Sequence, residues 1–493
     1  MEMLSLFIDA LGTIIVDPVL ILWIAIGVVI GIIFGSIPGL TATMAIVLFL
    51  PVTYAMNALS GISLLVALYI GGISGGLISA ILLNIPGTPS SIATCLDGNA
   101  MARKGEAARA LGLGIVFSFI GTVIGIIFLV LLTPLLAKLA IKFGPYEYCA
   151  VTVFSFSLVI ALTGKDMIKG LISTSLGAIL ASVGLSPIDS MERFTLGNYN
   201  LTTGFKLLVV LIGLFAITEV LKFAENTDSS DYVISDKVKI KGFGFSFKEF
   251  LRQIPNAIRS ALVGLVIGIL PGIGGSVSSM MSYTLAKNLS RKSDRFGEGM
   301  PDGIVASETA NNATIGGAII PLLSLGIPGD APTAILLGGL IIHGVTPGPL
   351  IYENNSDVVY GILAAMLLAA VIMLITEFFG IRLFVKLLNI PKKYLYPIII
   401  MLCCVGAIGD ANRVFDCWGI VLFGVIGYLL IKCDFPLPPL VLSFILGPSL
   451  ELNIRKASML AEYERFTISG HPIAFLFMIL AIFSVIWGIA KNK

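Results

Sequence analysis

Two short stretches of the sequence combine proline, glycine and polar side chains inside long apolar runs. The first runs from Asn84 to Ser90 and the second from Gly326 to Thr333. Proline removes a backbone donor and glycine permits non-helical backbone, so each stretch is expected to interrupt a helix. Lipid cannot satisfy the freed backbone groups, and such breaks persist where protein, water or a ligand does so. We therefore predict two binding elements; the alternative is a pair of packed proline kinks.

The chemistry expected at the two breaks is the binding of an anion. A helix that resumes after a break directs its N-terminal N–H groups at the break, and such groups bind carboxylates. No basic residue lies deep in an apolar run near the breaks, so helix ends, amides, hydroxyls and a co-bound cation would have to meet an anionic substrate. The predicted substrate-binding residues are Asn84, Pro86, Gly87, Thr88, Ser90, Pro328, Gly329 and Thr333.

Carboxylate and amide side chains near the second break suit a hard cation. Glu308 lies three residues before Asn311 and four before Asn312, so the three side chains can share a helix face, although the start of a helix at the cytoplasmic surface would look the same. Asp330 either holds a cation or caps the resumed helix. Two further Pro-Gly breaks complete the predicted cation-binding set, with small-residue packing as the alternative: Pro38, Gly39, Thr41, Thr43, Gly272, Gly274 and Ser276.

The composition is that of a polytopic α-helical membrane protein. The chain has 493 residues, of which 57% are hydrophobic and 12% charged, with a mean hydropathy of +1.01. Soluble proteins carry about 25% charged residues. Apolar runs of roughly 18 residues or more recur along the chain. The absence of a basic stripe argues against nucleic-acid binding.

The sequence offers no catalytic pattern and no metal-ligand pattern. The six cysteines and two histidines lack metal-ligand spacing. There is no nucleophile elbow, no pair of carboxylates at a working spacing and no phosphate-cradling loop. We therefore expect a protein that is not an enzyme, with no cofactor and no metal beyond a coupling cation.

An internal duplication organises the chain. Gly31–Leu40 matches Gly264–Ile273, and Ile85–Gly87 matches Ile327–Gly329 in the same order. We predict a first membrane repeat over 1–223, a polar cytoplasmic linker over 224–255, and a second membrane repeat over 256–493 with an extra C-terminal helix. The remaining spans are expected at 110–137, 149–163, 168–186, 205–223, 358–379, 394–409, 416–432, 437–449 and 470–489.

The distribution of Lys and Arg indicates that the repeats have opposite orientations. The loop after the first break is uncharged in the first half (57–61) and basic in the second (287–295). The loop after the second break reverses this, being basic at 97–109 and free of Lys and Arg at 343–357. Because basic loops stay in the cytoplasm, the two halves should be inverted. Inverted repeats with discontinuous helices are typical of secondary transporters.

The predicted fold is therefore an all-α polytopic membrane protein with about 10–14 membrane segments in two inverted-topology repeats. Matching charges on the two flanks of each first broken element predict a re-entrant hairpin or helix pair at 18–56 and at 256–288, with tips at Pro38-Gly39 and Pro271-Gly272. No Lys or Arg precedes Arg103, which favours an outside N-terminus. We expect a cytoplasmic C-terminus and a location in the cell membrane.

Several runs resemble the large membrane subunit of tripartite tricarboxylate transporters. In the first half these are Gly76–Gly98, Met101–Gly105, Arg109–Gly112 and Gly213–Glu219. In the second half they are Arg295–Gly299, Glu308–Asn312, Pro321–Gly329 and His343–Pro349. The chain departs from the family pattern at Asn99-Ala100 and at Asp330, which bears on the identity of the substrate.

The resemblance implies uptake of citrate-like tricarboxylates or other small carboxylates, driven by a Na⁺ or H⁺ gradient. It also implies two partners, a small membrane subunit and an extracytoplasmic solute-binding protein. Two other classes stay open at this point: a stand-alone carboxylate/cation symporter or channel without a binding protein, and an intramembrane enzyme or scaffold.

Overall fold

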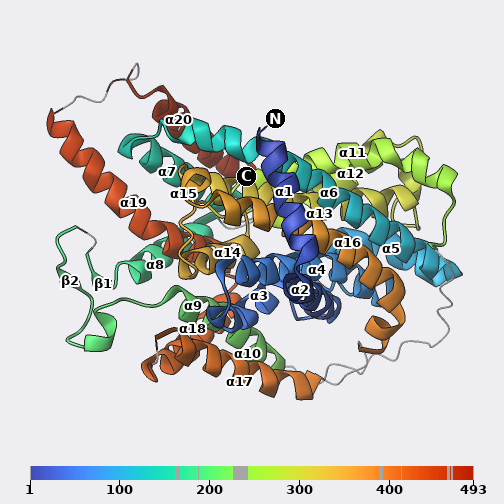
Figure 1. Ribbon diagram of the computed structural model, residues 1–493, viewed down its shortest axis with the longest axis horizontal. Coiled ribbons are helices and arrows are strands. Elements are labelled where there is room, and N and C mark those ends of the chain that lie inside the picture. Colours follow the sequence, from blue (N-terminus) through green and yellow to red (C-terminus); the bar gives the residue numbers. More distant parts are fainter. Residues whose placement is uncertain are drawn as a thin grey trace.

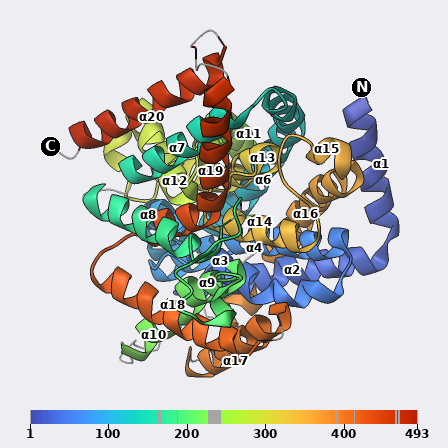
Figure 2. The same cartoon turned by 90° about the vertical axis from the view of Figure 1, so that its left-hand side faces the viewer.

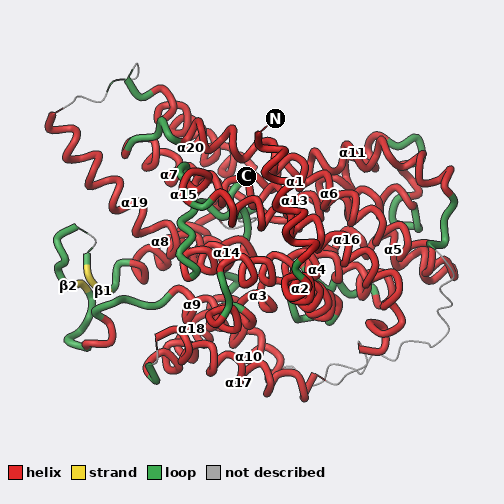
Figure 3. Tube along the Cα trace, viewed as in Figure 1, coloured by secondary structure: helices red, strands yellow, loops and turns green. Residues whose placement is uncertain are grey.

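The computed structural model describes residues 2–162, 167–186, 188–225, 243–387, 392–411, 413–463, 467 and 470–491. Helices make up nearly all of this part of the chain (Figure 1, Figure 3). The first half contains α1 (Glu2–Val16), α2 (Pro18–Ser36), α3 (Ala42–Phe49), α4 (Ala58–Leu83), α5 (Ile92–Met101), α6 (Ala107–Ala140), α7 (Pro145–Leu162), α8 (Met167–Ala181), β1 (Gly184–Leu185), β2 (Glu192–Arg193), α9 (Leu207–Leu211) and α10 (Thr218–Glu225).

The second half repeats the order of long and interrupted helices. Its elements are α11 (Phe247–Ile269), α12 (Gly274–Leu289), α13 (Pro301–Leu325), α14 (Ala331–Ile342), α15 (Ile351–Asn354), α16 (Ser356–Leu387), α17 (Lys392–Ala411), α18 (Phe415–Lys432), α19 (Leu437–Tyr463) and α20 (Pro472–Lys491). Residues 226–242, the middle of the predicted linker, lie outside the described residues.

The protein is a multi-pass helical membrane protein. Among the described residues, 8 helices are long and apolar enough to cross a membrane, and shorter apolar helices such as α8 and α14 accompany them. The central helix α4 is buried along its whole apolar window, and α13 is buried from Gly303 to Ser324. Figure 2 shows α4 inside the bundle and α1 at its edge.

The chain from α2 to α4 folds back on itself. A Cβ on Gly27 would meet Leu64 of α4, and one on Gly31 would meet Leu68, so the two helices run parallel. After α3 the chain returns to the start of α4, where a Cβ on Gly61 would lie 3.0 Å from Thr53 Cβ. Small residues permit this close approach. Residues 18–56 therefore form a hairpin whose tip is the Pro38-Gly39 turn, with Gly39 at φ 94°.

The second half contains the same arrangement. A Cβ on Gly264 of α11 would meet Ala310 of α13, and one on Gly268 would lie 2.7 Å from the carbonyl oxygen of Thr314. The far end of α12 returns to the start of α13, where Tyr283 lies against Gly303. The hairpin begins earlier than expected, because α11 starts at Phe247 with a Ser246 cap and accommodates Pro255 within the helix.

Loops from the two halves that have a similar charge lie in contact with each other. The uncharged segments meet where His343 Nε2 lies 3.0 Å from Thr53 Oγ1. The basic loop 97–109 also contacts the start of α11, where Arg109 donates to Glu249 at 2.6 Å. The buried Asp97 joins the same region, because its Oδ1 accepts from the backbone N–H groups of Gly297, Gly299 and Met300 at 2.7–2.9 Å.

Three expected spans have different lengths in the structure, and the one predicted at 358–379 continues as α16 to Leu387. The span predicted at 168–186 ends at Ala181, and the two-residue strands β1 and β2 follow as an antiparallel pair. The span predicted at 437–449 continues as α19 to Tyr463. Its polar last turns are held by ion pairs from Glu451 to Arg193 and Arg455. Arg455 lies four residues from Glu451 on the same helix, whereas Arg193 lies 258 residues away, so the local pattern did not show that contact.

Candidate functional site

The tip of the second hairpin lies between the two Ile-Pro-Gly breaks. The N–H of Gly272 donates to the carbonyl of Gly329 at 2.8 Å, which ties the tip to the second break. Ser279 Oγ donates to the carbonyl of Ser90 at 2.7 Å, which ties α12 to the first break. A Cβ on Gly275 would lie 2.8 Å from Ser90 Oγ. The structure thus brings Gly272, Gly274 and Ser276 together with residues of both predicted substrate elements.

The N-terminus of α12 is open toward this meeting point. Ile273 occupies the N-cap position and supplies no side-chain hydrogen bond. Gly272 and Gly274 have φ of 78° and 68°, a left-handed backbone that glycine adopts without strain. The first N–H groups of a helix lack partners within the helix and carry its positive partial charge. This end can therefore receive an anion.

Asn311 points its amide into the same space. A Cβ on Gly275 would lie 2.5 Å from Asn311 Oδ1, and Asn311 is 1% exposed. Neither Oδ1 nor Nδ2 of Asn311 has a hydrogen-bond partner. Buried polar atoms are almost always paired, so an unpaired amide beside an open helix end indicates an interaction with a bound species.

Asp330 caps α14 and contacts the first half of the chain. Its Oδ1 accepts from the N–H of Thr333 at 2.9 Å, and Thr333 Oγ1 accepts from the N–H of Asp330 at 2.9 Å. Its Oδ2 accepts a hydrogen bond from the Tyr69 hydroxyl of α4. Of the two roles weighed for this residue, the capping geometry is present in the structure, and a cation role stays a prediction.

Glu308 and Asn312 face a different neighbour from Asn311. Glu308 is fully buried and accepts from the hydroxyls of Thr94 and, at 3.0 Å, Ser118. The Asn312 amide donates to the Glu308 carbonyl at 3.0 Å and accepts from Thr122 at 3.4 Å. The expected convergence of three side chains is therefore split, with Glu308 and Asn312 toward α5 and α6 and Asn311 toward α12.

Comparison with known proteins identifies the family. The model of the tripartite tricarboxylate transporter TctA family matches residues 21–442. The chain belongs to this family. An uncharacterized 52.8 kDa protein from the TAR-I ttuC' 3' region of Agrobacterium vitis is 34% identical over 457 residues, which is 93% of this chain and 90% of that protein. A second uncharacterized protein of that organism, from the TAR-II ttuC' 3' region, is 36% identical over 197 residues, covering 40% of this chain and 81% of the relative. No solved structure matches.

Membership of the TctA family makes this chain a membrane subunit of a tripartite transporter and not an enzyme. A solute-binding protein and a small membrane subunit are the partners that the family implies. Within the part of the chain that the structure describes, no group of three or more His, Cys, Asp or Glu side chains could hold a metal ion.

The other predicted residues of this TctA-family chain have varied surroundings. Thr88 and Ser90 are buried, and Asn84 is exposed as the left-handed C-cap of α4 (φ 58°). Gly87 packs against the Gly35 carbonyl, and Gly329 packs in the same way against that of Gly268. In the first hairpin, Thr41 caps α3 by accepting from the N–H of Met44 at 3.2 Å. Of the remaining predicted residues, Thr43, Pro328 and Thr333 are buried, and Pro38, Gly39 and Pro86 are half-buried.

Two polar residues in the centre of the bundle were not predicted from the sequence. Glu377 of α16 is fully buried, and its Oε2 accepts from Ser74 of α4 at 3.0 Å while Oε1 has no partner. Tyr69 of α4 contacts Asp330. A lone carboxylate inside an apolar span is a signal that could have identified Glu377, because such residues are rare and usually functional. No sequence signal pointed to Tyr69.

Proposed function

We propose that the chain is the large membrane subunit of a secondary active transporter for small carboxylates, either citrate-like tricarboxylates or dicarboxylates. The observation that carries the proposal is the open N-terminus of α12, which lies against both Ile-Pro-Gly breaks and beside the unpaired Asn311 amide. Helix N–H groups, an amide and the Ser90 hydroxyl form a donor set for a carboxylate where no basic side chain is available.

A gradient of Na⁺ or H⁺ drives the uptake in this proposal. Glu308, with hydroxyls from Thr94 and Ser118, offers the oxygen ligands that a hard cation prefers. Glu377 offers a carboxylate with one unpaired oxygen that suits a proton. A charged carboxylate is costly to bury without a partner, so binding a cation or proton at either residue would stabilise the occupied state.

The two repeats have opposite orientations in this proposal, with the N-terminus outside and the C-terminus cytoplasmic in the cell membrane. The two parallel helix pairs, α2 with α4 and α11 with α13, support the repeat. The uncharged loops meet at Gly61 and His343, and the basic loop 97–109 meets the end of the other basic loop where Asp97 accepts from Gly297; both contacts support the inversion. Alternating access would then occur around a site formed by both halves.

Uptake in proteoliposomes tests the proposal. The full chain, with its small subunit, is reconstituted with and without a candidate binding protein, and labelled citrate and succinate are followed under Na⁺ or H⁺ gradients. We expect gradient-dependent accumulation that the binding protein increases. Equal uptake without the binding protein would support a stand-alone symporter. The absence of gradient-driven uptake of any carboxylate would overturn the proposal.

A further inference from the structure

A cavity with a mixed polar and apolar lining lies beside the start of the second break. Its volume is about 720 Å³, within the roughly 300–1,000 Å³ of small-molecule sites. Its walls come from α7, α8, α14, α19 and the segment 182–206. Gly326 and Ile327, the first residues of the second break, form part of its lining, as does 346–349 of the uncharged loop. The strands β1 and β2 beside it lie at the opposite end of the long axis from α5 (Figure 1).

Arg193 of β2 is the basic side chain among the described residues that line this cavity. Its Nη1 and Nη2 donate to the two oxygens of Glu451 at 2.8 and 3.1 Å, which is the fork geometry with which arginine binds a carboxylate. Its Nε is buried and has no hydrogen-bond partner. The guanidinium therefore already holds one carboxylate and retains a free donor.

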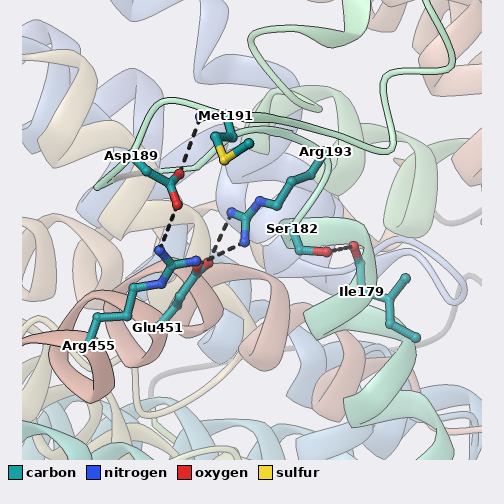
Figure 4. A network of polar contacts seen from close by, with 7 residues as sticks. All are labelled: Ile179, Ser182, Asp189, Met191, Arg193, Glu451 and Arg455. Carbon is teal, nitrogen blue, oxygen red and sulfur yellow. Dashed lines mark hydrogen bonds and ion pairs between the residues drawn. The ribbon is translucent and has the colours of Figure 1, made fainter. Parts of the chain in front are cut away.

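Glu451 has a second cation within reach. Arg455 lies 2.9 Å from Glu451 Oε1 and 3.1 Å from Asp189 Oδ2, as Figure 4 shows. Hydrogen bonds from Ser186 and Arg455 lower the pKa of Asp189 to about 2. Arg455 does not line the cavity. Glu451 could therefore leave Arg193 and remain paired with Arg455, so the exchange would leave neither carboxylate unpaired.

The Arg193–Glu451 pair is suited to exchange. The two side chains are 26% and 25% exposed, so the pair is partly open to solvent and to a ligand in the cavity. Hydroxyls and an amide from several elements also line the cavity and could bind the remaining carboxylates of a substrate: Thr152, Thr202, Thr203, Ser449 and Asn453.

We infer that this cavity is a receiving site for a small di- or tricarboxylate, in which Arg193 exchanges Glu451 for a substrate carboxylate before the substrate reaches the breaks. The inference rests on the proposed transport function. The loop 343–357 has no Lys or Arg, and the positive-inside rule assigns it to the outer face. The cavity would thus take substrate from outside, and its contact with Gly326 and Ile327 gives a route to the second break.

Equilibrium binding of labelled citrate and succinate to the full chain in nanodiscs tests this inference. We expect two binding components in the unaltered protein. Arg193→Gln should weaken one of them by about tenfold or more, the loss of one charge-assisted pair. Arg193→Lys keeps the charge but loses the two-pronged geometry, so its affinity for this component should lie between those of the unaltered protein and Arg193→Gln. Glu451→Gln should tighten the same component, because it removes the competing carboxylate.

Arg109→Gln is the matched control. Arg109 donates to Glu249 through Nε and Nη2, its side chain is 34% exposed, and neither residue lines the cavity. It should leave both binding components unchanged. Thermal unfolding of each variant shows whether a loss of binding reflects a loss of structure. The inference is wrong if Arg193→Gln and Arg109→Gln bind alike, or if Glu451→Gln binds more weakly. Normal gradient-driven uptake with those results would refute only the receiving site, whereas absence of both binding and uptake would refute the transport function.

Discussion

Replacing Asn311 by leucine tests whether its amide binds a ligand or has only a structural role. Leucine has the same number of side-chain heavy atoms and the same branching at Cγ but no polar atoms, so the change removes two buried atoms that have no partner. An unsatisfied buried polar group costs about 1–3 kcal/mol, and a near-isosteric change of shape costs less than about 1.5 kcal/mol. We therefore expect Asn311→Leu to leave the free energy of unfolding unchanged or to raise it by about 1 kcal/mol.

Asn312→Leu is the matched control on the next residue of the same helix. Asn312 is equally buried, but its amide donates to the Glu308 carbonyl and accepts from Thr122. Loss of these hydrogen bonds should lower the free energy of unfolding by about 1–2 kcal/mol. The two neighbouring substitutions are therefore expected to have opposite effects on stability, measured by thermal unfolding of the full chain in detergent.

Carboxylate uptake should fall in Asn311→Leu, although the stability of this variant is unchanged or increased. If Asn311 binds substrate or the coupling ion, losing one such contact costs about 1.4 kcal/mol or more, which is a tenfold loss in rate. We expect carboxylate uptake by Asn311→Leu in proteoliposomes to fall at least about tenfold while the protein stays folded. Normal uptake by Asn311→Leu, with a loss of stability equal to that of Asn312→Leu, would show that the amide has only a structural role.

Three further predictions concern titratable residues. Glu377→Gln should remove the dependence of uptake on a pH gradient while keeping the Ser74 contact; an unchanged response to the gradient would exclude Glu377 from proton coupling. Asp330→Asn should preserve the cap of α14 and shift the apparent cation affinity of uptake, whereas Asp330→Ala should also lower the unfolding free energy by about 1 kcal/mol; equal stability losses in both would contradict the capping role. The lowered pKa of Asp189 means that its pair with Arg455 stabilises the fold above about pH 4 and is lost as the pH falls toward 2. Pepsin should therefore cleave the segment 182–206 faster at pH 2 than at pH 4. Equal cleavage rates at the two pH values would contradict this prediction.

The sequence was most informative where local chemistry determines the backbone. Proline followed by glycine ends a helix whatever surrounds it, so the four breaks and both hairpin tips lie where the pattern predicted them. Long apolar runs likewise predicted α6 and α20 to within a few residues, because burial in lipid or protein requires them to be helical. The family followed from motifs that span most of the chain.

The sequence could not determine which neighbour each polar residue faces. Residues three and four apart lie on one side of a helix, but Asn311 and Asn312 are about 100° apart, and different helices pack on each. The buried environment of Glu377 depends on Ser74, which lies in the other half of the chain. The partner of Glu451 on α19, Arg193, is likewise distant in the sequence. Such partners become visible only when the halves are assembled.

The contacts of the buried Asp97 carboxylate limit when the two halves can assemble during synthesis. Its partners, the N–H groups of Gly297, Gly299 and Met300, lie 200–203 residues later in the chain. At about 5–20 residues per second, a ribosome needs roughly 10–40 s to reach them. During that interval the first half is already emerging from the ribosome while its carboxylate still lacks those N–H partners. The region around Asp97 can therefore make its final contacts only after synthesis has passed residue 300.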